Sequence, residues 1–330
     1  MQSQSIYPLV TCGFTTFNSE KTIKKALTSA LKQNYKNIEI LIVDDYSLDS
    51  TLKNIYSLLS TKKINYRVIK HNSNLGVAQA RNTLLKNAKG EFLAFFDSDD
   101  YSHENRISEQ LNHILIYEQN NFNKIEKYTF SPLCYCDREI IFNKNKKIYC
   151  KAMKISKNDQ KYKEQIIGSL LFCYPFPNFS ETGSTATCML LARTEVLKIL
   201  KGFNPVLRRY EDLDLAIKAV INNIPITKIN KSLVMQYYKE ASYKKYEYRY
   251  EIRLIYQYKK WLNQRGLYRF AFYFVNLKNN LLNLNLKNFV YYLCLIIFEN
   301  PFLFLKRIVS AFNTILFTLK IKLIKYSFND

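Results

Sequence analysis

Acidic residues stand at two places in this chain where a short apolar run ends. They are Asp44 and Asp45 after residues 38–43, and Asp97, Asp99 and Asp100 after residues 92–96. In extended backbone, side chains two positions apart point the same way, so Asp97 and Asp99 are expected to converge. Two converging carboxylates suit a hard divalent cation such as Mg²⁺ or Mn²⁺, with positions left for phosphate oxygens. The alternative is that these acids only cap helices and turns.

The first hundred residues alternate between strand-like and helix-like patterns, which predicts how the acids are positioned. Strand-like runs fall at 9–14, 38–43, 66–69 and 92–96, and helical spacing falls at 23–31, 50–59 and 77–88. Alternation with short links predicts parallel strands joined by right-handed crossovers. Ligands of such sheets bind beyond the carboxyl ends of the strands, where both acidic clusters fall. This placement favours a cation or sugar-nucleotide site over simple capping.

A third acidic group begins a later helix. Leu213, Ile217 and Val220 share one helical face, which places Glu211 and Asp212 in the first turn. Carboxylates are favoured there by the helix dipole, so an isolated helix of this kind needs no further explanation.

Ordered sequence blocks carry a family resemblance. Residues 10–18 are similar to a strand ending in P-T-Y-N, 29–35 to S-x-L-x-Q-x-Y, 42–51 to V-D-D-G-S-x-D-x-T, 74–82 to N-x-G-x-x-x-A-R-N and 97–99 to D-x-D. Residues 202–204 and 210–218 resemble G-x-F-(D/N) followed by E-D-x-D-L-x-x-R. Thr15 stands where Pro is usual, Tyr46 replaces Gly, and Lys218 replaces Arg. Over residues 9–238 the chain thus resembles the family 2 glycosyltransferases.

The resemblance implies an α/β chain with the GT-A (Rossmann-like) fold, a mostly parallel sheet flanked by helices, followed here by a helical C-terminal extension. It implies inverting transfer of a sugar from a nucleotide-diphosphate donor, with a UDP-sugar favoured. The acceptor would be a saccharide or lipid-linked glycan in surface polysaccharide, lipopolysaccharide or capsule synthesis. Asp212 is expected to be the general base, with Glu211 supporting it, and Asp99 with Asp97 to bind Mn²⁺ or Mg²⁺. The nucleotide-sugar site is expected to comprise Thr15, Phe17, Asp45, Arg81, Asp97 and Ser98.

Within that site the resemblance gives two residues a definite role. Asp45 would accept a hydrogen bond from the nucleobase, and Arg81 would meet the base or the phosphates. The alternative for Arg81 is a salt bridge on its own helix face. Relatives often carry a His near the metal after the strand at 233–238, but this chain has Lys-Glu-Ala-Ser at 239–242. We expect its three histidines, His71, His103 and His113, at the surface or in loops.

Length and composition set the domain expectations. The 330 residues carry a net charge of +22 and are 48% hydrophobic, so disorder is excluded as the dominant state. We expect a catalytic domain over 1–240, with a nucleotide-sugar half at 1–105 and an acceptor half at 106–240, and a basic, aromatic-rich helical region over 241–330. The seven cysteines include no C-x-x-C pair, so we expect most of them to be reduced, buried thiols and no zinc site. No secretory signal is visible in residues 1–8, so the cytoplasmic side is expected.

The C-terminal region suggests a membrane surface. Its apolar runs at 289–298 and 302–305 are shorter than the roughly 18 residues of a spanning helix. The amphipathic face expected beyond them contains Ile308, Phe312, Ile315, Leu316, Leu319 and Leu323. Such a helix suits peripheral contact with an anionic membrane. Packing on the catalytic domain and homodimerisation are the alternatives.

Two features of charge leave other functions to weigh. Eight lysines between 144 and 163 favour either a solvated loop or an anionic acceptor. A basic, tyrosine-rich chain could also bind nucleic acid, but no recognition motif is present, and none is expected as a partner. A catalytically silent GT-A-like scaffold is disfavoured by the intact Asp97, Asp99 and Asp212.

Overall fold

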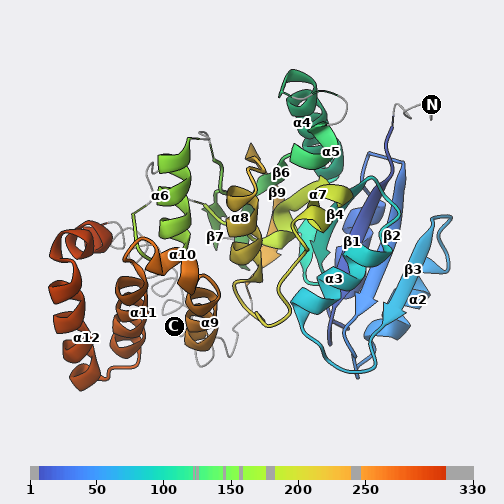
Figure 1. Ribbon diagram of the computed structural model, residues 1–330. Helices are drawn as coiled ribbons and strands as arrows, with labels where there is room; N and C mark the ends of the chain where they lie inside the picture. The colour runs from blue at the N-terminus through green and yellow to red at the C-terminus, as the bar shows by residue number, and fades with distance from the viewer. Residues whose placement is uncertain are drawn as a thin grey trace. The chain divides into compact units, whose positions relative to one another are not determined.

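Four parallel strands form one half of the sheet, as the alternating pattern predicts. The computed structural model describes residues 7–121, 123, 126–143, 146–155, 159–175, 183–238 and 247–309. The four strands are β1 (Val10–Thr16), β2 (Ile38–Asp44), β3 (Tyr66–Lys70) and β4 (Phe92–Asp97), in the order β3-β2-β1-β4. They alternate with α1 (Ile23–Leu31), α2 (Thr51–Leu59) and α3 (Val77–Asn87) (Figure 1). Each acidic cluster therefore begins at the carboxyl end of a parallel strand.

The sheet is buried on both faces. Val10, Cys12 and Phe14 of β1 pack with α1, α2 and α4 (Arg106–Asn121) in one apolar cluster that includes Leu27 and Ile55. On the opposite face, Gly13 lets α3 approach closely, because a Cβ there would come 2.9 Å from Leu93 and 3.1 Å from Leu84. Burial on both faces explains why these strands are continuous apolar runs.

The second half of the sheet is mixed. Its strands are β5 (Asp100–Ser102), β6 (Leu133–Asn143), β7 (Lys146–Cys150), β8 (Leu190–Arg193) and β9 (Ile226–Tyr237). The order continues from β4 through β8, β6 and β9 to β5, and β7 pairs with β6. Only β6 and β9 are parallel here; the pairs β4–β8, β6–β8, β5–β9 and β6–β7 are antiparallel. The remaining helices of this part are α5 (Glu126–Phe130), the 3₁₀ helix η2 (Thr187–Met189), α7 (Thr194–Ile199) and α8 (Glu211–Ile221).

A buried arginine joins the two halves at β4 and β8. Arg106 is fully buried, and its Nη2 donates to the carbonyls of Phe95 at 2.9 Å and Leu190 at 3.3 Å. Its Nη1 and Nε donate to Ser102 Oγ at 2.9 Å and Gln110 Oε1 at 3.1 Å. With these polar groups paired, the guanidinium can remain inside the sheet layer.

The chain divides into two units. The first comprises Met1–Ser156 with Ser180–Ala241 and holds the sheet, and the second comprises Lys157–Phe179 with Ser242–Asp330. The sequence predicts residues 157–179 in the catalytic domain, whereas in the structure they cluster with the C-terminal helices. The helices of the second unit are α6 (Gln160–Leu170), α9 (Glu247–Gln257), α10 (Lys259–Asn263), α11 (Tyr268–Leu282) and α12 (Leu286–Glu299). Arg265, just after α10, donates to Glu164 of α6 at 2.6 Å, which ties the two segments together.

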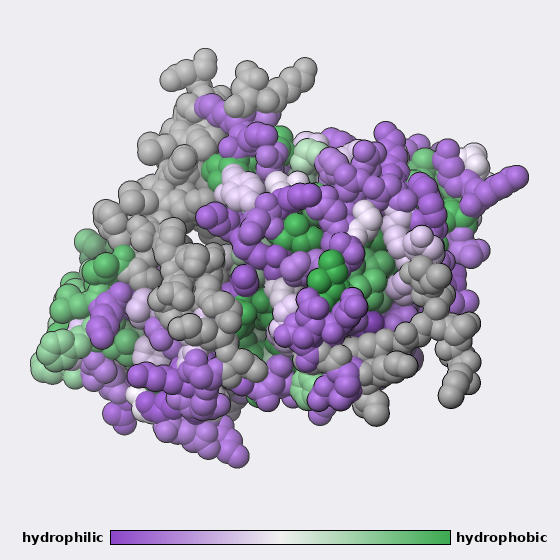
Figure 2. Space-filling view, turned by 90° about the horizontal axis from the view of Figure 1, so that it is seen from above, coloured by the Kyte–Doolittle hydropathy of each residue, from purple (hydrophilic) through white to green (hydrophobic). Residues whose placement is uncertain are grey.

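The last described helices expose large apolar side chains. Phe298 is 87% exposed and Phe302 is 78% exposed, and Figure 2 shows hydrophobic surface over α12. Among the described residues, no single helix has the length and hydropathy of a membrane span; α12 and the helix Pro301–Val309 meet that test only together, with a bend of 117° between them. The amphipathic face predicted through Phe312–Leu323 lies outside the described residues.

Candidate active site

The strand register places the acidic clusters at one edge of the sheet. Central strand β1 pairs Thr16 with Asp44 of β2 and Thr15 with Asp97 of β4. The carboxyl ends of these strands therefore lie side by side, as the parallel topology predicts. Thr15 is 9% exposed, at the centre of this edge.

Arg81 links the D-x-D block to the acidic helix start. Its Nη1 donates to Glu211 Oε1 at 2.7 Å, and its Nη2 donates to Asp97 Oδ1 at 3.3 Å. The guanidinium is almost fully buried, and the carboxylates of Asp97, Glu211 and Asp212 raise its pKa against the effect of burial. Its partners lie on β4 and α8, so the alternative of a salt bridge on its own helix face does not hold.

Asp212 has a raised pKa. Burial, and then repulsion from Glu211, raises its pKa from 3.8 to about 7, against the lowering effect of Arg81 and of the Leu213 N–H that donates to Oδ1 at 2.8 Å. The residue before this pair, Tyr210, has a left-handed backbone with φ of 64°, so the chain turns sharply into α8. A carboxylate with a pKa near 7 can accept a proton at neutral pH.

A buried tyrosine lies near the same carboxylate. Tyr135 on β6 is fully buried, and its hydroxyl has no hydrogen-bond partner among the described residues. Burial, and then the charge of Asp212, raises its pKa, while Arg81 lowers it. The Tyr135 hydroxyl therefore stays protonated beside the acidic pair.

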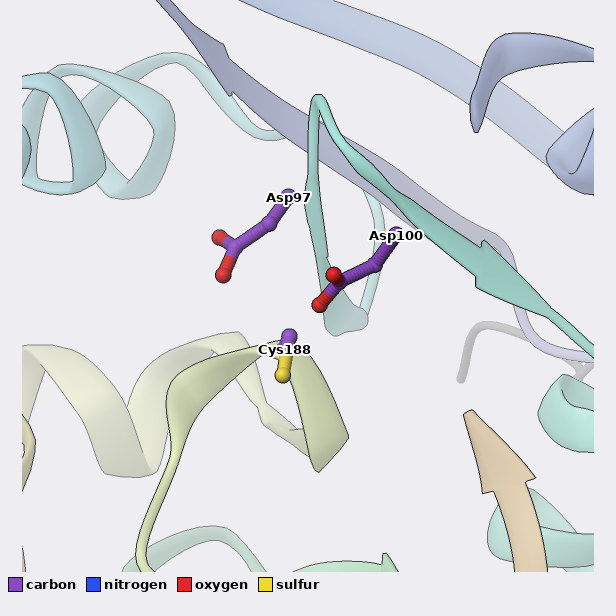
Figure 3. Close-up of side chains that lie close together, drawn as sticks. All are labelled: Asp97, Asp100 and Cys188. Carbon is purple, nitrogen blue, oxygen red and sulfur yellow. The ribbon is translucent and has the colours of Figure 1, made fainter. Parts of the chain in front are cut away.

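The turn after β4 changes which acids converge. Ser98 and Asp99 form a turn between β4 and β5, so the extended geometry expected for Asp97 and Asp99 is not present. Asp97 instead lies with Asp100 and Cys188, each offering one ligand atom within 4.8 Å of the others (Figure 3). The half-buried Asp99 sits beside this group, and its role as a cation ligand remains a prediction.

The group around Asp100 suits a cation. Asp100 is 6% exposed, and its Oδ1 has no hydrogen-bond partner among the described residues, while Oδ2 accepts from Gln236 of β9 at 3.5 Å. Burial, and then the charges of Asp97 and Asp99, raises the pKa of Asp100 well above its usual value. A divalent cation would satisfy the unpaired oxygen and offset the repulsion between the carboxylates.

Asp45 holds the loop that follows β3. Its Oδ1 accepts from the Leu75 N–H at 2.9 Å and its Oδ2 from the Gly76 N–H at 2.7 Å. His71 Nδ1 lies 2.8 Å from Oδ1, and His71 Nε2 lies 2.9 Å from Thr83 Oγ1. Both carboxylate oxygens of Asp45 therefore already accept hydrogen bonds from this loop, and any bond to a nucleobase would be additional.

His71 lies in the loop directly after β3, as expected, but the expectation did not include its contact with Asp45. Its side chain is only 9% exposed. The available signal was its position directly after a parallel strand, at the same edge as Asp45 and Asp97.

The two remaining candidate residues lie in neighbouring turns. Ser98 is buried, and its hydroxyl forms a 2.7 Å hydrogen bond with that of Ser19. Phe17, just beyond β1, is 47% exposed. Ser98 thus fastens the loop after β1 to the turn after β4, while Phe17 offers an open aromatic surface.

Other residues of the matched blocks support the site from behind. Asn82 exchanges hydrogen bonds with the backbone of Phe203, to its carbonyl at 2.7 Å and from its N–H at 2.8 Å. Lys218, which replaces the Arg of the family pattern given above, pairs with Asp214 at 2.9 Å and donates to the Gly202 carbonyl at 3.1 Å. These contacts fix the loop before α8 and hence the position of Glu211 and Asp212.

Known proteins with similar sequences are named as glycosyltransferases. Residues 12–122 match the model of glycosyl transferase family 2. A similar protein is the Escherichia coli UDP-Glc:alpha-D-GlcNAc-diphosphoundecaprenol beta-1,3-glucosyltransferase WfaP, 42% identical over 37% of this chain and 44% of WfaP. An uncharacterized glycosyltransferase of Rickettsia prowazekii is 31% identical over 65% of this chain and 60% of its own length. The matches thus span about half of these relatives.

Solved structures show the same fold. S. aureus TarS 1-349 in complex with UDP superposes with a TM-score of 0.53, at 19% identity over 86% of this chain and 88% of that one. The mannosyltransferase PcManGT from Pyrobaculum calidifontis, in complex with GDP-Man and Mn²⁺, gives a TM-score of 0.54, at 16% identity over 88% and 75%. The fold is the GT-A fold that the sequence predicted.

Proposed function

We propose that this protein is an inverting glycosyltransferase that moves a sugar from a UDP-sugar to a lipid-linked saccharide. The observation that carries the proposal is the Arg81 bridge between Asp97 and Glu211. It places the raised-pKa carboxylate of Asp212 beside the carboxyl edge of the nucleotide-binding half of the sheet. This proximity supports a base and a diphosphate site that lie next to each other.

In the proposed reaction, Asp212 accepts the proton of the acceptor hydroxyl as that oxygen attacks the anomeric carbon. The bond between the anomeric carbon and the diphosphate breaks on the opposite face, and its electron pair leaves with the nucleoside diphosphate. Attack opposite the leaving group inverts the configuration. Arg81 keeps Glu211 paired, so the full repulsion of Glu211 does not fall on Asp212.

The donor side is supported by the acids around the turn after β4. Asp97, with Asp99 and Asp100 close in sequence, would hold Mn²⁺ or Mg²⁺. A bound divalent cation supplies positive charge for the departing diphosphate. Phe17 and the Asp45-supported loop would frame the nucleoside. The similar structures contain UDP or GDP-Man with Mn²⁺, and the relative WfaP is named for a UDP-Glc donor, which favours a nucleotide-diphosphate donor here.

The acceptor side is supported by relatives and by surface chemistry. WfaP is named for an acceptor carried on diphosphoundecaprenol, a lipid diphosphate. In this chain α12 exposes apolar side chains, and residues 239–330 carry 16 Lys and Arg against 5 Asp and Glu. Apolar burial combined with basic charge suits peripheral binding to an anionic membrane. We therefore propose a role in surface-polysaccharide assembly at the inner face of the cell membrane.

The test is transfer from UDP-glucose to a GlcNAc-diphosphate-lipid acceptor by the full chain, with Mn²⁺ present and after chelation. We expect product with inverted configuration in the presence of Mn²⁺ and loss of product after chelation. Asp212→Asn should keep UDP binding and lose transfer. The matched control is Glu195→Gln, an exposed acid of α7 that lies outside the site.

The outcomes separate the alternatives. UDP binding without transfer by the wild-type chain to any lipid-linked acceptor would favour the silent scaffold. Near-normal transfer by Asp212→Asn would remove Asp212 as the base. Equal binding to neutral and anionic vesicles would contradict the membrane proposal while leaving the chemistry intact.

A further inference from the structure

Cys188 adds a sulfur atom to a site otherwise made of carboxylates. It lies in η2 and is 1% exposed. Its Sγ and one oxygen each of Asp97 and Asp100 lie within 4.8 Å of one another, and Figure 3 shows the three side chains close together. Asp97 and Asp100 come from the two sides of the turn after β4, whereas Cys188 comes from a segment about ninety residues later in the chain.

We propose that Cys188 is a ligand of the cation site and that its thiolate makes the site prefer Mn²⁺, Co²⁺ or Zn²⁺ over Mg²⁺. This inference rests on the cation role proposed above for Asp97 and its neighbours. Mg²⁺ prefers oxygen ligands in near-octahedral geometry, whereas thiolates select softer transition metals. A single sulfur therefore changes which cation occupies the site.

The first supporting observation is the unpaired oxygen of Asp100. Its Oδ1 is buried without a hydrogen-bond partner among the described residues. Leaving such an oxygen unpaired in a buried place is costly, so its presence points to a ligand that the fold is shaped to receive. Among the described residues, Asp97 and Cys188 each place a potential ligand atom within 4.8 Å of a carboxylate oxygen of Asp100.

The second observation is the guanidinium beside the sulfur. Arg138 Nη1 donates to Cys188 Sγ at 3.8 Å. This contact places a positive charge next to the sulfur, where it would offset the negative charge of a metal-bound thiolate. When the metal–sulfur bond forms, the thiol proton passes to solvent and a sulfur lone pair binds the metal. Two carboxylates and one thiolate are then balanced by the divalent cation and Arg138.

The alternative is that Cys188 is only a small buried side chain. Cys136 on β6 is a suitable comparison, because it is also fully buried and its Sγ lies 3.8 Å from the carbonyl of Met189, next to Cys188. Cys136 does not belong to the group of potential ligands. A change that affects metal binding through Cys188 but not through Cys136 therefore reports ligation rather than packing.

The experiment is titration of the full chain with Co²⁺, followed by its absorption spectrum, with and without UDP. Every variant carries Cys294→Ser, because Cys294 is exposed and could bind cobalt on its own. A cobalt–thiolate bond gives a near-ultraviolet charge-transfer band, separate from the visible bands of bound cobalt. We expect the charge-transfer band in the parent protein, which carries Cys294→Ser alone. Adding Cys188→Ser should remove this band and retain the visible bands of bound cobalt. Adding Cys136→Ser should leave the charge-transfer band in place. Calorimetry should show that Cys188→Ser reduces the ratio of Mn²⁺ to Mg²⁺ affinity.

Failure of this inference is distinguishable from failure of the proposed function. Cobalt bound together with UDP but without the charge-transfer band would overturn the role of Cys188 and leave the nucleotide site standing. The band in the parent with no effect of UDP on cobalt affinity would support Cys188 as a ligand and count against the nucleotide role. A band that survives Cys188→Ser, or no cobalt binding at all, would also overturn the inference.

Discussion

Asp212→Asn is expected to make the protein inactive and, at neutral pH, more stable. The folded environment raises the pKa of Asp212 from 3.8 to about 7, chiefly by burial and then by the charge of Glu211. At 1.36 kcal/mol for each pKa unit, keeping this carboxylate ionised in the folded state costs about 4 kcal/mol. Asparagine has a similar shape without the charge, so it removes that cost.

The pH dependence follows from the sign of the shift. Below the unfolded value of 3.8 the carboxyl is protonated in both states, so the wild type retains its full stability there. As pH rises from 3.8 to about 7, the unfolded chain loses its proton first and wild-type stability falls relative to the variant. The advantage of Asp212→Asn should therefore be small near pH 4, grow through pH 5 and 6, and level off above about 7.

Urea unfolding at several pH values measures this difference, with Glu195→Gln as the exposed-acid control. In the same buffers, wild-type kcat/KM should rise with pH through about 7, because the base must be deprotonated. Glu211→Gln should move that midpoint to lower pH by removing the repulsion. A stability difference that is absent, or that is the same at every pH, would refute the burial argument for Asp212.

Three further changes test the supporting structure. Arg81→Met should lower the free energy of unfolding by about 3–5 kcal/mol in urea, because it leaves the buried Glu211 and the half-buried Asp97 without their cation. It should also weaken UDP binding in calorimetry. An unchanged unfolding midpoint would contradict the stabilising role of this ion-pair bridge. Tyr46→Gly should raise the free energy of unfolding by up to about 1 kcal/mol, because Tyr46 has a φ of 69° that glycine adopts without strain. The control Tyr46→Ala should give no such increase. Asn82→Ala should lower the free energy of unfolding by about 2 kcal/mol and speed hydrogen exchange of the Phe203 amide, because both hydrogen bonds to that backbone are lost. Normal protection of the Phe203 amide would contradict the role of Asn82 in holding this loop.

The local pattern was sufficient for the first half of the fold. Strand-like runs and helical spacing predicted β1 to β4 and the three intervening helices, because burial on both faces of a parallel sheet demands continuous apolar strands. The same reasoning predicted that Asp45 and Asp97 would lie at one edge. It also placed Glu211 and Asp212 in the first turn of a helix, where the structure has them.

The structure shows how the chain accommodates two residues that differ from the family pattern, Tyr46 and Lys218. Tyr46 keeps the left-handed conformation that its glycine counterpart would adopt freely. Lys218, without the forked donor of arginine, divides its contacts between Asp214 and a backbone carbonyl. The sequence showed the replacements, but not how the chain accommodates them.

The sequence by itself determined which chemical groups are present and at which strand or helix end each one stands, because periodicity and turn signals act over a few residues. Tertiary structure alone decided which of them meet. The pairing of Arg81 with Glu211 spans 130 residues. The tight turn at 98–99 brings Asp100, rather than Asp99, together with Asp97 and the distant Cys188. Such contacts depend on the packing of whole elements against one another, which no local pattern encodes.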